Sequence, residues 1–564
     1  MAETTEINQQ KEMEKAQQVA QEQVAAINGA APSEQPMTVF TGRQKIYTDY
    51  INSNQLSPSM NGCIVLSEDN MHDALTKAMK VHVDNAREIE YLLDYAKGKQ
   101  NILNRQKETR SDVNNRVVIN YAESFTRDII GYTFGKPMQY TIRRGEDNVK
   151  DELKLISDYT EVANKSVSDN KKATTASICG ISHRGVFKNP DYNEDNEDES
   201  PFTYMDLDPK NTFVAYSSQI GNKEVFACTY ITGQDENNEN YTLYTVYTTD
   251  KVYQYKTNGF SNTIMKDNLV KGYPQPNPLG ICIVENENNQ FRMGHWETGI
   301  TLMDAINKIA SDSVNDIEQF VDAILVAVNA EFTEEMVQTV RDEHYAEIKS
   351  PMGLNADLKY IQGQLDGASV EQTRQYLEAC LRVVVGIPDR KSRGGGGGDT
   401  GDAVKLRDGW ADMEVVARNT DTFNKVSEKK ELKVILKILR AENLIKNISM
   451  LNVDMKYPRN KTDNIVSKAQ AISTLYNTKI MAPEDVLEIG DITTDVADVV
   501  ARGTKYWKQK AEEGFEEQKR QLELRGVEDV TQEGVGNANN KSNTDNTNNT
   551  DNRTKSAEPT GSDK

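Results

Sequence analysis

The sequence predicts an α+β protein, because helical patterns and strand patterns occupy separate stretches of the chain. Residues 68–135 carry apolar side chains at helical spacing. Residues 200–290 are rich in Thr, Tyr and Val with turn residues between short runs, and the chain after residue 296 is again mostly helical. Its 564 residues suffice for two or three domains with sizeable cores.

Composition argues against several classes of protein. The net charge is -21, whereas proteins that grip nucleic acid through phosphate usually present a basic face. An acidic protein can still surround DNA without gripping it. The N-terminus lacks the apolar core of a signal peptide, and the most apolar run, Phe320–Val328, is far shorter than the roughly twenty residues of a membrane span. We therefore expect no membrane association, and a cytoplasmic protein until assembly.

The cysteines are odd in number, scattered and never arranged as Cys-x-x-Cys. This pattern favours buried thiols in a reducing compartment over a disulfide framework or a zinc site. The five are Cys63, Cys179, Cys228, Cys282 and Cys380.

Both ends of the chain are predicted to be disordered. Residues 1–36 are rich in Gln, Glu and Ala without a sustained apolar face, which is typical of a mobile arm. Residues 531–564 include eight asparagines between Asn537 and Asn552 and have almost nothing to bury.

Between these ends, the first helical region is followed by the strands. Gly135 and Pro137 are expected to stop the helix, and six acids between Asp191 and Glu199 most simply form a solvated loop. A calcium site is the alternative for this loop, although its spacing lacks the Gly and terminal Glu of an EF-hand. The helical spacing before Gly135 is carried by Val118, Tyr121, Phe125, Ile129 and Tyr132.

The region after residue 296 predicts one long helix with a shorter partner. Apolar residues step by three or four over roughly eight turns, or about 43 Å. Because the partner helix Ser369–Val385 is too short to cover this stripe, we expect neighbouring subunits to bury the rest. The segment 331–366 has mixed character, and helical patterns return over Ala403 to about Leu439 and over 464–528, where Pro483 is placed as a first-turn residue. The stripe consists of Ile300, Met303, Ile306, Ala310, Val314, Ile317, Val321, Ile324 and Val328.

Residues 115–142, NRVVINYAESFTRDIIGYTFGKPMQYTI, closely resemble a segment of the portal proteins of long-tailed phages that infect mainly Gram-positive hosts. The order that follows is also similar: a β-rich wing, the long helix at 303–326, the motif VVVGIPD at 383–389, a Gly-rich loop and another long helix. The resemblance covers roughly residues 70–450. The chain departs from the family in its run of five glycines and in its C-terminal block, which matches only in being helical.

This resemblance implies a ring, typically of twelve subunits, that forms the channel for double-stranded DNA during packaging and ejection. It implies docking of the terminase motor and then of head–tail adaptors, contact with the major capsid protein and scaffold, and a place at the portal vertex of the virion. The expected parts are a disordered arm (1–36), wing (37–295), first stem helix (296–330), clip (331–366), second stem helix (367–386), tunnel loop (387–402), long helix and wing return (403–463), crown (464–530) and disordered tail (531–564).

The Gly-rich segment has three interpretations. Backbone freedom suits a loop that moves around DNA, and neighbouring positive charge could touch phosphate. A plain linker is the second. Nucleotide binding is the third, since Gly396, Gly398 and Gly401 fit G-x-G-x-x-G, but the following helix runs on for roughly 35 residues with no second strand. The expected tunnel-loop residues are Arg390, Lys391, Arg393, Gly394, Gly395, Gly396, Gly397 and Gly398.

The long helix carries many acids. Asp304, Asp312 and Asp316 lie on one face together with Lys308. They form either a solvated outer face or a channel wall whose carboxylates repel phosphate so that DNA does not stick; the repulsion reaches about 8 Å. The expected subunit-interface residues are Val314, Ile317 and Val321.

No catalytic residue, metal or cofactor is expected. The five histidines show no metal-ligand spacing, and the chain has no G-x-x-x-x-G-K-[ST] motif of a packaging ATPase. The alternatives are another head protein such as a head–tail adaptor, against which the chain's length argues, and a terminase or nuclease.

Overall fold

The computed structural model divides the chain into two units, Met1–Asn464 and Ile465–Lys564. The predicted arm and tail, most of the expected clip and residues 389–402 of the expected tunnel loop lie outside the described residues. The structure describes residues 41–55, 62–107, 111–143, 149–193, 198–321, 324–328, 357–361, 367–388, 410–459, 465–478, 482–490 and 496–524.

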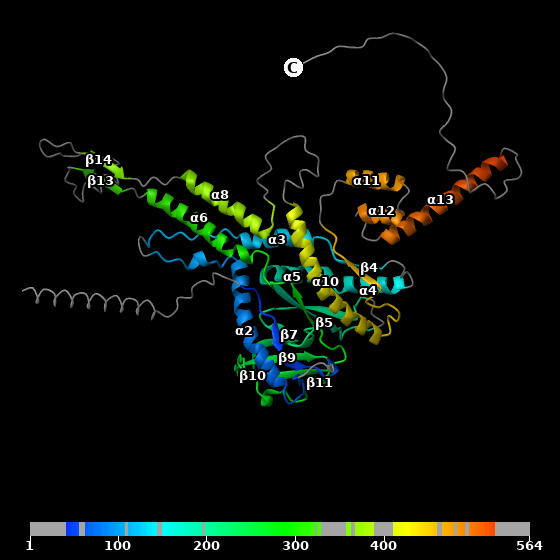
Figure 1. Cartoon of the computed structure of the whole chain (residues 1–564), viewed down its shortest axis with the longest axis horizontal. Coiled ribbons are helices and arrows are strands. Elements are labelled where there is room, and N and C mark those ends of the chain that lie inside the picture. The colour runs from blue at the N-terminus through cyan, green and yellow to red at the C-terminus, as the bar shows by residue number, and fades with distance from the viewer. Residues whose placement is uncertain are drawn as a thin grey trace, which may run out of the picture. The chain divides into compact units, whose positions relative to one another are not determined.

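The predicted strand region forms most of a six-stranded sheet (Figure 1). Five of its strands are paired antiparallel in sequence order, and burial alternates along β9 (Asn240–Thr248) from residue to residue, as expected for strands with one buried face. Helix α2 (Met71–Ala96) supplies the apolar side chains that pack on this sheet, among them Met71, Leu75 and Met79. In spatial order the strands are β1 (Ile46–Thr48), β7 (Thr212–Ser217), β8 (Glu224–Gln234), β9 (Asn240–Thr248), β10 (Lys251–Asn258) and β11 (Gln275–Pro276).

A second sheet has three strands in the order β12 (Ile283–Glu287), β5 (Ile181–Lys188) and β6 (Phe202–Leu207). Two helices that are far apart in the sequence pack against it, α5 (Lys165–Cys179) and α10 (Trp410–Ala441). The sheet therefore joins the middle of the chain to its later part.

The C-terminal half of α10 packs in an apolar core. Leu432, Ile435 and Leu439 are buried there together with side chains of helix α4 (Lys150–Val162). The strands β4 (Gln139–Ile142) and β15 (Val453–Lys456) pair antiparallel beside them. The shorter elements are β2 (Tyr50–Ile51), β3 (Ile64–Val65), η1 (Ser53–Gln55), η2 (Asn101–Asn104), η4 (Lys266–Asn268) and η5 (Glu297–Gly299).

The predicted first helical region is interrupted. Helix α3 (Tyr121–Thr133) begins only where the side chain of Asn120 accepts a hydrogen bond from the backbone N–H of Glu123, an N-cap. Residues 113–120 carry no helix, so the prediction that helical structure runs throughout 68–135 was wrong for this stretch, and Val118 is not helical.

The long stem helix is shorter than predicted. Helix α6 (Ile300–Val321) ends seven residues before Val328, and residues 324–328 instead form strand β13 (Ile324–Val328). This strand pairs antiparallel with β14 (Asp357–Ile361). The sequence ILVAV is rich in β-branched residues, so once a partner strand is available it forms a ladder rather than another helical turn. The partner helix is confirmed as α8 (Gly367–Val385).

The second unit contains the predicted C-terminal helices. They are α11 (Ile465–Asn477), α12 (Pro483–Gly490) and α13 (Val496–Leu524), and Pro483 is the first residue of α12, as expected. Within this unit α12 packs against both of the other helices. None of the helices in the described part of the chain is both long and apolar enough to cross a membrane.

All five cysteines are free. The prediction of buried thiols is confirmed for Cys179, Cys228 and Cys282, whereas Cys63 and Cys380 are partly exposed.

Candidate assembly site

Helices α6 and α8 form a hairpin-like pair that lies side by side (Figure 1). The base of this pair is buried in a core where α2, α3, α6, α8 and α10 meet. Ile300, Met303 and Ile306 of α6 contribute to it, and Leu381 and Val385 of α8 lie in the same cluster. The spacing of three or four residues brings these side chains onto one helix face, so the first half of the predicted stripe is buried within the subunit.

The other half of the stripe is exposed. Val314 is 40% exposed and Ile317 is 68% exposed, and the side chain of Val321 lies outside the described residues. On α8, Tyr376 is 67% and Val383 is 82% exposed. The α6–α8 pair therefore presents apolar side chains that no described part of the same chain covers, as the sequence predicted for Val314 and Ile317.

A polar ladder on α6 anchors the non-helical segment before α3. The side-chain oxygens of Asn307, Ser311 and Asn315 accept hydrogen bonds of 2.8, 2.9 and 2.7 Å from the backbone N–H groups of residues 119, 117 and 115. Four helical residues rise about 6 Å and two extended residues about 6.7 Å, so the two repeats match closely. All three side chains are buried. Sequence reasoning missed this ladder, whose only signal is a polar residue at every fourth position.

Two of the three expected channel-wall acids are held by the same subunit. Asp304 accepts hydrogen bonds from the Tyr95 hydroxyl (2.9 Å) and the Asn101 amide (2.8 Å), and burial raises the pKa of Asp304. Asp312 pairs with Arg105 at 2.5 Å. Asp316 is half-buried. Residues 95–105 thus pack against α6 and engage both acids, but the side chain of Asp312 stays 40% exposed, and the channel-wall role of these acids stays a prediction.

The expected tunnel-loop residues 390–398 lie outside the described residues, and so do 399–402. The first two positions of that predicted loop are described. Ile387 belongs to the core at the base of α6 and α8, and Pro388 is also buried. Both positions follow the last residue of α8 and belong to no helix or strand, and the loop boundary expected at 387 stays a prediction. Gly386 ends α8 with φ +75°, a left-handed conformation that suits glycine.

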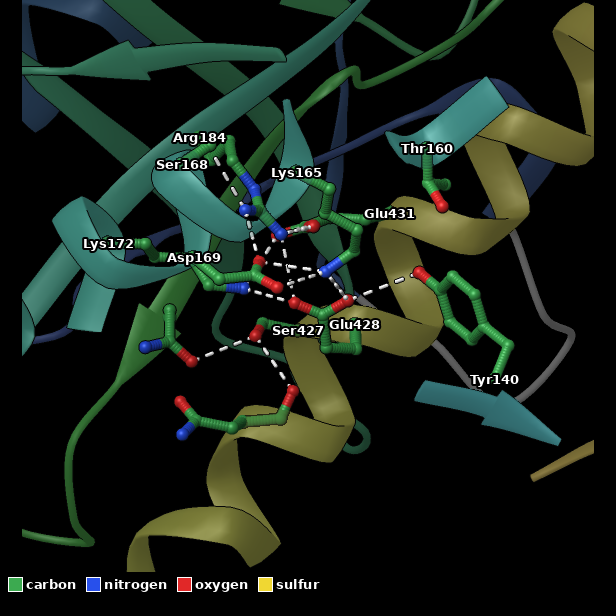
Figure 2. Close-up of polar contacts among 12 residues, drawn as sticks. Tyr140, Thr160, Lys165, Ser168, Asp169, Lys172, Arg184, Ser427, Glu428 and Glu431 are labelled. Carbon is green, nitrogen blue, oxygen red and sulfur yellow. Dashed lines mark hydrogen bonds and ion pairs between the residues drawn. The ribbon is translucent and has the colours of Figure 1, made fainter. Parts of the chain in front are cut away.

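A buried ionic cluster joins α10 to α5 and β5 (Figure 2). It contains three cations and three acids, so its formal charges balance. Figure 2 shows the two α10 acids directed at the cations. The cations are Lys165, Lys172 and Arg184, and the acids are Asp169, Glu428 and Glu431.

The contacts inside this ionic cluster are short. Lys165 Nζ lies 3.0 Å from Glu428 Oε2, and Lys172 Nζ lies 3.1 Å from Glu431 Oε1. Arg184 bonds both α10 acids. Burial alone would raise the pKa of Glu428, but the three cations hold the pKa well below its usual range. The cluster thus fixes the position of α10, the helix that follows the expected tunnel loop.

The sequence carried no usable signal for this ionic cluster, since its members come from three elements up to 266 positions apart. Among the residues that the structure describes, no three His, Cys, Asp or Glu side chains gather in a way that could hold a metal ion.

Comparison with known proteins identifies one family. Residues 78–523, most of the chain, match the family model described as phage portal protein, SPP1 Gp6-like. The match begins within α2 and ends within α13, so it includes the α6–α8 pair and the ionic cluster. No curated protein matches the chain.

Proposed function

Because the chain belongs to the SPP1 Gp6-like family of phage portal proteins, we propose that it assembles into a closed ring through which double-stranded DNA passes. The ring stands at one capsid vertex, and the α6–α8 pair of each subunit contributes to its stem. Twelve subunits is the number that the family resemblance implies for the capsid.

One observation carries this proposal. The α6–α8 pair is buried in the core at its base, but further along it exposes apolar side chains. Val314 and Ile317 of α6 and Tyr376 of α8 face solvent away from the base, in the isolated chain. Val314 and Ile317 are three positions apart and therefore neighbours on one face of α6, and oligomers cover such exposed apolar neighbours with a second copy. In a ring each subunit offers this surface to its neighbour.

The parts proposed to meet DNA are one acid of α6 and the Gly-rich segment. Asp316 is the better candidate for a channel-wall acid, because Asp304 and Asp312 are engaged by Tyr95 and Arg105. For the tunnel loop we propose Arg390, Lys391, Arg393 and the glycines at 394–398. Their positive charge would touch phosphate weakly and release it, as passage requires.

The portal guides and seals the DNA and carries out no covalent chemistry. The terminase motor supplies the work during packaging, and head–tail adaptors take its place on the clip afterwards. The major capsid protein and scaffold surround the ring. The subunit is made in the host cytoplasm and ends in the virion.

Electron microscopy and native mass spectrometry of the purified full-length protein test the proposal. We expect rings with a central hole and a mass that is an integral multiple of 63.4 kDa. A protein that stays monomeric at every concentration would contradict it. Turnover of ATP by the purified protein alone would favour a packaging enzyme instead.

A further inference from the structure

The second half of α10 turns its acids inward and its bases outward. Residues 425–440 contain six bases and two acids, and both acids, Glu428 and Glu431, are buried in the ionic cluster (Figure 2). Charges that are mixed along the sequence are therefore separated by the fold, and the exposed side of this stretch is positive. The six bases are Lys425, Lys429, Lys430, Lys433, Lys437 and Arg440.

Four of these bases lie in one line along the helix. With 3.6 residues per turn, Lys429, Lys437 and Arg440 fall within about 40° of Lys433 around the helix axis, whereas the two buried acids fall about 140–160° away from it. All four bases are exposed. At 1.5 Å per residue the line is about 16 Å long. We call these four residues the basic stripe.

No carboxylate of the described residues neutralises the basic stripe. Two of its members donate hydrogen bonds to backbone oxygens, which carry no net charge, and the other two, Lys429 and Lys433, pair with no acid in the described part of the chain. The first two are Lys437, bonded to Leu279 at 2.8 Å, and Arg440, bonded to Ile448 at 2.7 Å.

The positive charges of the basic stripe repel one another. Partial burial and the neighbouring charge of Lys433 together lower the pKa of Lys437. This repulsion is kept in a chain whose net charge is -21 and which therefore has acids in excess. Negative charge from outside the subunit would relieve it.

We propose that the basic stripe of α10 binds the phosphates of double-stranded DNA. A DNA strand is a linear array of negative charge, so one strand contacts several bases of a straight line at once, whereas a free phosphate ion contacts one or two. The line has no apolar member between residues 429 and 440, unlike the core of a protein–protein interface, which is depleted of charged residues. Contacts from lysine and arginine to phosphate carry no sequence information, which suits DNA of any sequence.

This contact goes beyond the proposed function, because it uses neither the acid of α6 nor the Gly-rich segment. The choice of DNA as the partner rests on that function, whereas the charge of the basic stripe does not. The contact also reconciles an acidic chain with a nucleic-acid partner, since the positive charge is confined to one helix face.

Anisotropy of a short fluorescein-labelled DNA duplex, titrated with the full-length protein at increasing salt, measures the contact. Lys429→Gln with Lys433→Gln should weaken binding at least about tenfold at low salt. The logarithm of the binding constant should also depend less steeply on the logarithm of the salt concentration, by about 2, because each lost phosphate contact contributes about 0.9. The matched control is Lys80→Gln with Lys154→Gln, at exposed positions of α2 and α4. It changes the net charge equally and should bind like the parent, and both variants should keep the parent's melting temperature.

A photoreactive p-benzoylphenylalanine in place of Val426 tests where the duplex lies. Val426 is 53% exposed, about 20° around the helix from Lys433 and three residues before the basic stripe. Irradiation should attach the duplex covalently to this position, and Lys429→Gln with Lys433→Gln should lower the yield about tenfold. The matched control is the same amino acid at Val167, which is 52% exposed and about 160° around α5 from Asp169 of the ionic cluster. This control should give little adduct.

Three results would each overturn the inference. They are attachment from position 426 to a second protein chain, no attachment to DNA, and a salt dependence of the double glutamine variant equal to that of the parent. Electron microscopy of the same samples keeps the two proposals apart. Rings that do not bind the duplex through the basic stripe contradict this inference alone, whereas subunits that bind it there without forming rings contradict the ring alone.

Discussion

The side-chain oxygen of Asn307 accepts a 2.8 Å hydrogen bond from the backbone N–H of Ile119, across 188 positions of sequence. This bond is the first rung of the ladder by which α6 holds the segment before α3. The segment thereby gains for its backbone the partners that a helix would otherwise have supplied.

Removing a rung should destabilise the subunit. Asn307→Ala or Ser311→Ala leaves a part-buried backbone N–H without its acceptor, so the free energy of unfolding should fall by about 1 kcal/mol for each. Urea unfolding measures the loss, and hydrogen exchange at the amides of residues 115, 117 and 119 should become faster. Lys308→Ala, at an exposed position of the same helix, is the control. Equal losses of unfolding free energy in all three variants would show that the ladder does not stabilise the subunit.

The exposed end of the α6 stripe should be needed for assembly and not for folding. Val314→Asp and Ile317→Asp should each prevent ring formation, because a neighbour would have to bury an unpaired charge at a cost of several kcal/mol. The circular dichroism spectrum of the subunit should be unchanged, since both side chains are exposed in the single chain. Thr301→Asp, also at an exposed position of α6, should leave rings intact. Intact rings from both apolar-to-Asp variants would remove the stem assignment.

The buried ionic cluster should tolerate loss of a pair better than loss of one partner. Glu431→Gln leaves Lys172 and Arg184 without one acid, and we expect a loss of about 3–5 kcal/mol in unfolding free energy. Adding Lys172→Met should recover part of this loss, which a double-mutant cycle measures.

The matched surface pair for this experiment is Lys188 and Glu442, which are in contact at 2.6 Å with Lys188 more than half exposed. Glu442→Gln should cost only about 0–1 kcal/mol. A cost for Glu431→Gln no larger than that would mean that the cluster does not fix α10.

Acid should destabilise the subunit through two buried histidines. Burial lowers the pKa of His82 and His295 to about 4 from an ordinary 6.5. Between pH 6.5 and pH 4 these histidines are protonated in the unfolded chain and largely neutral in the folded chain. The free energy of unfolding therefore decreases as the pH falls through this range. Each group contributes at most about 3 kcal/mol. The melting temperature across this range should fall less steeply in His295→Gln, and an unchanged slope would rule out His295 as a contributor.

Backbone freedom in the Gly-rich segment should matter for DNA rather than for assembly. Gly395→Pro with Gly397→Pro fixes φ near -65° at both positions and restricts the residue before each. We expect rings to form but DNA packaging or retention to fail, measured as DNA per particle. Normal filling would make the segment a passive linker.

The companion variant separates charge from mobility in the same segment. Replacing Arg390, Lys391 and Arg393 with glutamine removes charge and leaves the glycines in place. Any DNA contact that it weakens should depend on salt in the parent protein.

The sequence by itself determined the helices and strands whose signal is local. The stripe from Ile300 to Ile306, the strand composition of 200–290 and Pro483 at the start of a helix were all correctly interpreted, because periodicity and turn chemistry act over a few residues. The sequence also predicted that Val314 and Ile317 are exposed in the single chain, because the partner helix is too short to cover the whole apolar stripe.

Only the tertiary structure decided what depends on distant partners. Residues 324–328 fit a helix or a strand by pattern, and pairing with 357–361 made them a strand. Residues 115–119 are not helical because α6 offers oxygens at a matching repeat. Arg105 pairs with Asp312 across 207 positions, and Arg184 pairs with Glu431 across 247 positions. Such ion pairs form wherever the fold brings opposite charges together, and no local spacing in the sequence predicts them.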